Sequence, residues 1–346
     1  MRKSLLILAL IALVLNVQAG VVIPKVAYIT FQKTMDATGT PATTVQNDPI
    51  IQTLKADPNL NVTVIVLTSV LATDVIADLA TYDVIIVQES FSGAAGMLTP
   101  AGALALKTIP KPFIYNKMYA LQKTRALSNT TSAGAGKEAD GTATGTLSIT
   151  VEAAALTNDL FKACTFENGN QIKLFNALST DIGLLGAGTS IKAINYNSGT
   201  TLSGGALLAQ PSILSGTFAC ALGINSLPAT TVIDGTETTL APSIFLGMNF
   251  GAICANAGKN ITDNGLTIWR NAVYILAGLA VPSTKATLPT AVNSIDATSK
   301  IISEDYYSIN GVQVKEPKKG AYIKKTVYEN GTTKLDKVVL IQELTK

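Results

Sequence analysis

The chain of 346 residues contains no histidine, and this absence excludes several kinds of chemistry. A Ser-His-Asp triad, a Cys-His dyad, an imidazole general base and a histidine-ligated zinc or haem all require that side chain. Charged residues are scarce as well, at 14% of the chain, and the formal net charge is only +3. So small a charge gives no indication of binding to nucleic acid or to an anionic membrane surface.

The chain has only three cysteines, Cys164, Cys220 and Cys254, each among small or apolar neighbours. These surroundings are typical of buried thiols. A disulfide between Cys220 and Cys254 is the alternative. A catalytic thiolate is not favoured, because neither histidine nor an adjacent basic residue is present to lower the pKa of a thiol.

The chain has no apolar run long enough to cross a membrane. A shorter apolar run at the N-terminus has the pattern of an export signal. A cationic start at residues 1–3 precedes an apolar run of 11 residues over 5–15. Val17 and Ala19 then provide small side chains before a cut at Gly20. A membrane anchor would need roughly 18–20 apolar residues. We therefore predict a Sec-type signal peptide over residues 1–19 and a mature protein without a transmembrane segment.

Apolar strands alternate with helical patterns through the first third of the chain. Such continuously apolar strands are typical of parallel sheets that helices cover on both faces. We expect them at residues 26–30, 61–68, 83–90 and 112–116. Helices are expected from Asp48-Pro49, over 71–82 and over 99–109. Because helices between parallel strands form right-handed crossovers, the prediction is an α/β fold with a doubly wound, mostly parallel sheet.

After residue 122 the pattern consists of short strands between turn residues. Expected strands, which would extend the sheet in antiparallel fashion, lie at 147–152, 171–175, 191–196, 206–209 and 217–222. A further apolar strand is expected over 244–250. A helix then begins at its cap Thr262 and ends at Gly278 and Pro282. Its apolar face is formed by Leu266, Trp269, Val273 and Leu276.

Three segments of this region resemble the class I glutamine-amidotransferase-like (flavodoxin-like) superfamily, especially its secreted, trehalose-utilisation-type relatives. They are Leu79-Ala-Thr-Tyr-Asp-Val-Ile-Ile-Val, Pro112-Phe-Ile-Tyr-Asn-Lys-Met and Ile261-Thr-Asp-Asn-Gly-Leu-Thr-Ile-Trp-Arg-Asn-Ala. The resemblance covers roughly residues 24–282 and implies an amidotransferase-like α/β domain over 20–282. Catalytic members of the family use an elbow cysteine with a downstream histidine and acid. Here the elbow segment offers Asn116, Lys117 and Met118, so the resemblance implies a domain without the catalytic triad.

The C-terminal part of the chain has a different composition. Residues 296–346 contain 9 lysines and 7 acidic residues among 51, whereas the preceding 295 residues hold the other 33 charged side chains. This step follows a Pro/Ser/Thr stretch and indicates a linker over 283–295. Alternating strand patterns around two Asn-Gly turns, at Asn310 and Asn330, then predict a small β-sandwich over 296–346.

The same tail resembles the C-terminal sorting domain of the type IX secretion system of Bacteroidetes. The matching order is Tyr306-Tyr-Ser-Ile-Asn-Gly-Val-Gln-Val, then Pro317-Lys-Lys-Gly-Ala-Tyr-Ile, then Asn330-Gly with Lys337-Val-Val-Leu. The motif positions are Tyr307, Asn310, Gly311, Gly320, Tyr322, Gly331 and Lys337. The resemblance implies the type IX secretion machinery as a partner, and a secreted or outer-surface protein whose tail is often removed. The alternative is a plain β-module used for adhesion or stability.

Candidate functional residues follow the predicted parallel strands. In open α/β sheets ligands bind beyond the carboxyl ends of the strands. The residues expected in that crevice are Gln32, Glu89, Ser90, Asn116 and Lys117. Glu89 is a candidate acid or acceptor with Lys117 as its cationic partner, and the alternative is an ordinary strand-end ion pair or solvated side chains. The scattered carboxylates lack the spacing of a calcium loop, and neither a metal nor a cofactor is expected.

Two classes of function remain open. The favoured hypothesis is an exported binding or structural protein without catalysis, whose ligand is a glycan or another component of the cell envelope. The alternative is a secreted carbohydrate-active or other hydrolase that uses strand-end carboxylates, such as Glu89 with a second acid. A retaining glycosidase holds its two carboxyl groups about 5–5.5 Å apart, and an inverting one about 6.5–9.5 Å apart.

Overall fold

The computed structural model divides the chain into two compact units, Met1–Leu288 and Pro289–Lys346. The boundary lies within the predicted linker. The residues whose structure is described are 22–30, 48–66, 73–90, 106, 108–116, 141–142, 147–176, 194–196, 202–214, 223–233, 238–255, 258–289, 301–308, 312–315, 317, 320–328 and 333–340. The predicted signal peptide and the predicted strand over 217–222 lie outside them.

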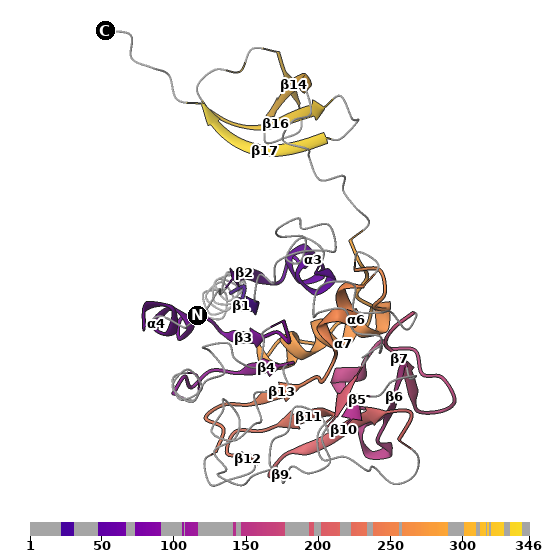
Figure 1. Ribbon diagram of the computed structural model, residues 1–346. Coiled ribbons are helices and arrows are strands. Elements are labelled where there is room, and N and C mark those ends of the chain that lie inside the picture. Colours follow the sequence, from indigo (N-terminus) through magenta and orange to yellow (C-terminus); the bar gives the residue numbers. More distant parts are fainter. Residues whose placement is uncertain are drawn as a thin grey trace, which may run out of the picture. The chain divides into compact units, whose positions relative to one another are not determined.

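The first unit is built on a nine-stranded sheet whose first five strands run parallel (Figure 1). These strands are β1 (Lys25–Thr30), β2 (Asn61–Val66), β3 (Val84–Val87), β4 (Phe113–Tyr115) and β13 (Ser243–Phe245). Their order in the sheet is β2-β1-β3-β4-β13, and every adjacent pair among them is parallel. The predicted α/β character is therefore present, and the carboxyl ends of these strands share one edge of the sheet.

The remaining four strands extend the sheet in antiparallel fashion beyond β13, and the sequence predicts three of them, β10, β6 and β7. They are β11 (Ile224–Leu227), β10 (Ala206–Pro211), β6 (Ser148–Val151) and β7 (Gln171–Lys173). Two small ribbons pair β5 (Gly141–Thr142) with β8 (Asn195–Tyr196), and β9 (Leu202–Ser203) with β12 (Val232–Ile233). Short 3-10 turns lie at Ala153–Ala155 and Asp159–Phe161. The sheet is thus mixed.

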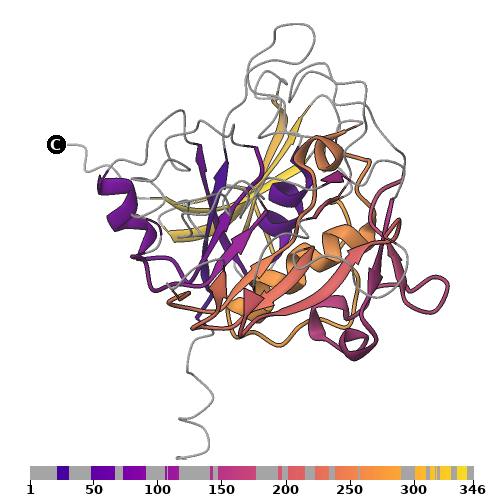
Figure 2. The ribbon, with the colours of Figure 1, turned by 60° about the horizontal axis from the view of Figure 1, so that its bottom comes forward.

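Helices cover both faces of the parallel half. Alternate residues of β1 point to opposite faces, so Val26 and Tyr28 join one core cluster while Ala27 and Ile29 join the other. The first cluster includes α3 (Pro49–Ala56) and α7 (Asp263–Leu276), and the second includes Leu79 at the end of α4 (Thr73–Leu79). Figure 2 shows α4 at the left of the strands, apart from α7 (orange).

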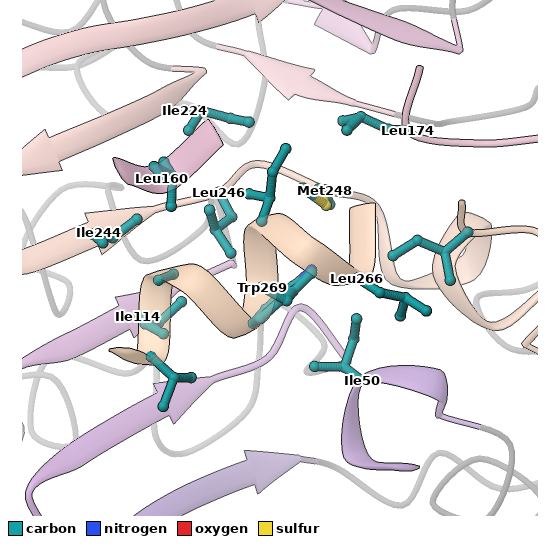
Figure 3. Close-up of a cluster of buried hydrophobic side chains, with 14 of the residues drawn as sticks. Ile50, Ile114, Leu160, Leu174, Ile224, Ile244, Leu246, Met248, Leu266 and Trp269 are labelled. Carbon is teal, nitrogen blue, oxygen red and sulfur yellow. The ribbon is translucent and has the colours of Figure 1, made fainter. Parts of the chain in front are cut away.

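Helix α7 confirms the helix predicted after Thr262. The Thr262 hydroxyl accepts the N–H of Gly265 at 3.2 Å, and the chain leaves the helix at Gly278 with φ of 69°. Trp269 is only 1% exposed and packs among aliphatic side chains from the sheet and from α3 (Figure 3). Helix α3 also begins where predicted, because the Asp48 carboxylate accepts its first N–H groups.

Two predictions for this unit are wrong. The strand expected over 244–250 ends at Phe245, because the chain turns at Gly247, where φ is 60°, and Asn249 caps a new helix, α6 (Phe250–Cys254). The strand expected over 191–196 does not extend the large sheet, because its described residues include β8, which pairs with β5 in a separate ribbon. Cys254 is a free, buried thiol as expected, which excludes the alternative of a disulfide with Cys220. Strand β11 was not expected from the sequence.

The second unit is a single antiparallel sheet rather than the predicted sandwich, as far as its described residues go. Its strands are β14 (Ile301–Ser308), β15 (Gln313–Val314), β16 (Gly320–Tyr328) and β17 (Thr333–Leu340), in the order β15-β14-β16-β17. A salt bridge of 2.6 Å joins Lys324 to Glu304 across β16 and β14. Among the sorting-motif positions, Tyr307, Gly320, Tyr322 and Lys337 lie on these strands, and Asn310, Gly311 and Gly331 lie outside the described residues.

No helix in the described part of either unit combines the length and the apolar character needed to cross a lipid bilayer.

Candidate functional site

Polar side chains gather at the carboxyl edge of the parallel strands. Thr30 ends β1, the segment 88–90 follows β3, and Asn116 follows β4. Met248 and Asn249 come soon after β13. All of these residues are buried, although most carry polar side chains. Since a buried polar group must find a hydrogen-bonding partner, their arrangement determines what this edge can do chemically.

Asn116 links the segment after β4 to the segment after β13. Its Nδ2 atom donates to the main-chain oxygen of Met248 at 2.6 Å, and its Oδ1 atom accepts the N–H of Met248 at 2.8 Å. The same Nδ2 group donates to Oε1 of Gln88 at 2.6 Å. The N–H of Glu89 donates to that Gln88 oxygen at 2.7 Å, so Asn116 and Glu89 meet at one acceptor.

The chain of hydrogen bonds continues from Gln88 to the start of α3. Gln88 Nε2 donates to the Tyr28 hydroxyl at 2.6 Å, and that hydroxyl donates to Asp48 Oδ2 at 2.5 Å. The other carboxylate oxygen of Asp48 accepts the N–H groups of Ile50 and Ile51 at 2.9 and 3.4 Å. A single chain of side chains therefore connects β4, β3 and β1 with the N-terminus of α3.

Burial determines the protonation states of Asp48, Tyr28 and Cys254. Desolvation raises the pKa of Asp48 to about 6, although the hydrogen bonds from Tyr28 and from the backbone oppose the shift. Burial and the neighbouring Asp48 carboxylate raise the pKa of Tyr28 and that of the Cys254 thiol on α6. Tyr28 and Cys254 are consequently neutral near pH 7, and Asp48 changes its charge just below that pH.

Glu89 occupies a second polar region beside this chain. The side chain is 4% exposed, and its Oε2 atom accepts the N–H of Phe250, the first residue of α6. Its Oε1 atom accepts from Nδ2 of Asn195 on β8 at 3.2 Å and from Nδ2 of Asn249 at 3.5 Å. Amide groups from two distant segments thus hold the carboxylate in place.

A pair of hydroxyl groups completes the site. Oγ1 of Thr30 and Oγ of Ser90 lie 2.9 Å apart and join the carboxyl ends of β1 and β3. Both residues are buried. The site can therefore fix the segments that follow four parallel strands. Within the described residues no three Cys, Asp or Glu side chains gather as the ligands of a metal ion would.

Three of the residues predicted to line a crevice, Glu89, Ser90 and Asn116, follow the parallel strands at this edge and are buried, and their role in binding a ligand stays a prediction. Gln32 and Lys117 lie outside the described residues, so the expected pairing of Glu89 with Lys117 stays a prediction.

Sequence reasoning missed the side chains that connect these residues: Tyr28, Asp48, Gln88, Asn195 and Asn249. Asp48 was recognised only as a helix cap. Gln88 had one available signal, since it is a polar residue at the end of an apolar strand, next to Glu89.

A comparison of the chain with protein-family models, with curated proteins and with solved structures finds no match.

Proposed function

We propose that this protein is an exported, non-catalytic binding or structural protein of the cell surface. In this proposal the first unit is a flavodoxin-like domain related to the class I glutamine amidotransferases, and the second is a sorting domain recognised by the type IX secretion machinery. The strand order β2-β1-β3-β4-β13 supports the first assignment, because it follows the flavodoxin-like order 2-1-3-4-5 with helices on both faces.

The observation that carries the non-catalytic assignment is the environment of Asn116. This residue follows β4, where catalytic relatives would place a nucleophile. A nucleophile needs an activating base and room for a substrate. Both ends of the Asn116 side chain are instead engaged with the main chain of Met248, and the residue has no solvent exposure. The chain also has no histidine to serve as the base.

The two acids of the described site also support a non-catalytic role. Glu89 accepts hydrogen bonds from the first turn of α6 and from Asn195, and Asp48 accepts them from Tyr28 and the first turn of α3. Through Gln88 and Tyr28, the hydrogen-bond chain joins Asp48 to the main-chain N–H of Glu89. Both carboxylates thus accept hydrogen bonds from groups of the protein itself, which supports a structural role for them.

The second unit and the charge pattern support export. The chain divides into two units near the composition step, and the second unit is all-β with four of the motif positions on its strands. The cationic start and apolar run of residues 1–15 form the N-terminal end of the chain. A separate, strand-rich C-terminal unit is the form expected for a module that acts as a sorting signal.

The test of export is localisation in a Bacteroidetes host with and without a working type IX system. The full chain should become accessible to added protease on intact cells, and a variant ending at residue 288 should remain in the periplasm. A fluorescent protein that carries the export signal and residues 289–346 is the matched control, and it should reach the surface as well. Full-length protein found in the cytoplasm, or surface display of the truncated chain, would contradict the proposal.

The test of the non-catalytic assignment is a hydrolase screen of the purified full chain against glycosides and amides. We expect no turnover above the background of the buffer. The variants Glu89→Gln and Glu167→Gln form a matched pair, because Glu89 is buried in the site and Glu167 is exposed. Turnover that Glu89→Gln abolishes and Glu167→Gln retains would establish the hydrolase instead.

A further inference from the structure

The carboxylate of Asp48 is surrounded by donors. Its Oδ2 atom accepts the hydroxyl of Tyr28, and its Oδ1 atom accepts the main-chain N–H groups of Ile50 and Ile51. The residue is only 1% exposed, so bulk water has little access to it. A proton added at a lone pair that already accepts one of these bonds would point at a group that presents a hydrogen. Protonation at such a position conflicts with the local hydrogen-bond pattern.

The conflict cannot be resolved at Tyr28 alone. Once Oδ2 carries a proton, the Tyr28 hydroxyl has to turn its own hydrogen toward another acceptor. Its other partner, Gln88, presents Nε2, which is a donor. A flip of the Gln88 amide would offer an oxygen to Tyr28. The same flip would turn NH₂ toward Asn116 Nδ2 and the N–H of Glu89, which both donate to Gln88 Oε1 now.

Asp48 is the group in this cluster that titrates near neutral pH. The ionisable groups that face it in the described residues are Tyr28 on β1 and Cys254 on α6. Burial raises the pKa values of both, so they stay neutral between pH 5 and 8, whereas burial brings the pKa of Asp48 to about 6. The buried cation of α7, Arg270, interacts with Asp57 and Tyr274 instead.

We propose that Asp48 is a proton-operated switch that couples the start of α3 to the polar edge behind β3, β4 and β13. With Asp48 ionised, the hydrogen bonds run in one direction from Asn116 through Gln88 and Tyr28 to the carboxylate. With Asp48 protonated, the cap of α3 weakens and this chain rearranges, which loosens the segments that Gln88 and Asn116 hold. The switch responds to mild acidification outside the cell or in a compartment, and it does not depend on which ligand the unit binds.

The fluorescence of a tryptophan can report on changes at the start of α3. Trp269 is the single tryptophan of the chain. It lies on α7 in the core cluster that also contains Ile50, the residue whose N–H Asp48 accepts (Figure 3). Fluorescence of the full chain should follow one titration with a midpoint near pH 6. The variant Asp48→Asn should abolish this transition, and Asp78→Asn, which changes an exposed acid of α4, should retain it.

Changes at the segments after β3 and β13 can be measured by the hydrogen exchange of two main-chain amides. The N–H of Glu89 donates to Gln88 and the N–H of Met248 donates to Asn116. Hydrogen exchange measured by mass spectrometry should show their protection factors, corrected for intrinsic exchange, falling about tenfold from pH 7.5 to pH 5, as expected for the loss of one hydrogen bond. In Tyr28→Phe the link is cut, so Trp269 should still titrate while the two amides should no longer respond.

Three results would overturn the proposal. The first is a wild-type protein whose Trp269 emission and amide protection are the same at pH 5 and pH 7.5. The second is an Asp48→Asn variant that titrates like the wild type. The third, which serves if Asp48→Asn fails to fold, is a Tyr28→Phe variant whose Glu89 and Met248 amides still respond to pH.

Discussion

The side chain of Asn116 continues the sheet between β4 and β13 where the two main chains separate. The last main-chain bond of this ladder runs from the N–H of Leu246 to the oxygen of Tyr115. The chain then turns at Gly247, and Asn116 donates to the oxygen and accepts the N–H of Met248, as a strand residue would. The first prediction tests how much these two hydrogen bonds from the Asn116 side chain contribute to stability.

We expect Asn116→Ala to destabilise the first unit by about 2–4 kcal/mol, because the substitution leaves the buried N–H and oxygen of Met248 and Oε1 of Gln88 with fewer partners. Urea unfolding followed by Trp269 fluorescence measures this cost. Asn176→Ala is the matched control. Asn176 is exposed and donates one bond to the oxygen of Lys259, so its loss should cost less than about 1 kcal/mol. Equal costs for the two variants would show that the Asn116 bridge contributes little.

The second prediction concerns the pH dependence of stability. Burial raises the pKa of Asp48 from its usual 3.8 to about 6, so the folded protein binds this proton more tightly than the unfolded chain does. The contribution of Asp48 is therefore most favourable below the unfolded pKa and is lost as the pH rises through the folded one. The full shift corresponds to about 3 kcal/mol, of which about 2.4 kcal/mol falls between pH 4 and pH 7.

The measurement is the difference in unfolding free energy between the wild type and Asp48→Asn at several pH values. The wild type should lose about 2.4 kcal/mol relative to the variant as the pH rises from 4 to 7. The exposed-acid variant Asp78→Asn should show no such trend. A difference that changes in the opposite direction would mean that hydrogen bonds from Tyr28 and the backbone outweigh desolvation. The free energy of unfolding would then rise with pH, as it does for a carboxylate whose pKa is lowered by its partners in the folded state.

Local signals explain which parts of the fold were predictable from the sequence. Asp48-Pro49 and Thr262 are caps whose effect is confined to one helical turn, and both helices begin where these residues predict. The second half of the apolar run 244–250 was misread as strand, because an apolar run alone does not reveal the turn at Gly247 or the cap at Asn249. Over so few residues, an apolar strand and a short apolar helix have the same run of apolar side chains in the sequence.

The polar edge was only partly predictable, because its bonds join distant segments. Strand ends identified Glu89, Ser90 and Asn116, since the carboxyl ends of parallel strands meet at one edge. The bond from Tyr28 to Asp48 spans 20 residues, and that from Asn195 to Glu89 spans 106. No local pattern marks such pairs. Tyr28 in particular occupies an apolar strand position, where an aromatic side chain is expected to serve packing alone.

The third prediction follows from the division into two units. Deletion of residues 289–346 should leave the midpoint of urea unfolding of the first unit unchanged, because the core clusters around Trp269 and around Ile29 are complete within residues 1–288. Limited proteolysis of the full chain should also yield a stable fragment that ends near residue 289. A truncated chain that unfolds at much lower urea would show that the first unit requires the second.

The last prediction reverses the usual effect of alanine in a helix. Gly265 lies in the first turn of α7, where alanine would normally favour the helix by up to about 1 kcal/mol. A methyl group there would stand 2.6 Å from Cγ1 of Ile261 and 3.1 Å from the oxygen of Leu174, which are closer than atoms pack. Gly265→Ala should therefore destabilise the unit by about 1–3 kcal/mol in urea unfolding. In an Ile261→Ala background the same substitution should cost less, because the nearest obstacle is removed, and equal costs in both backgrounds would contradict this explanation.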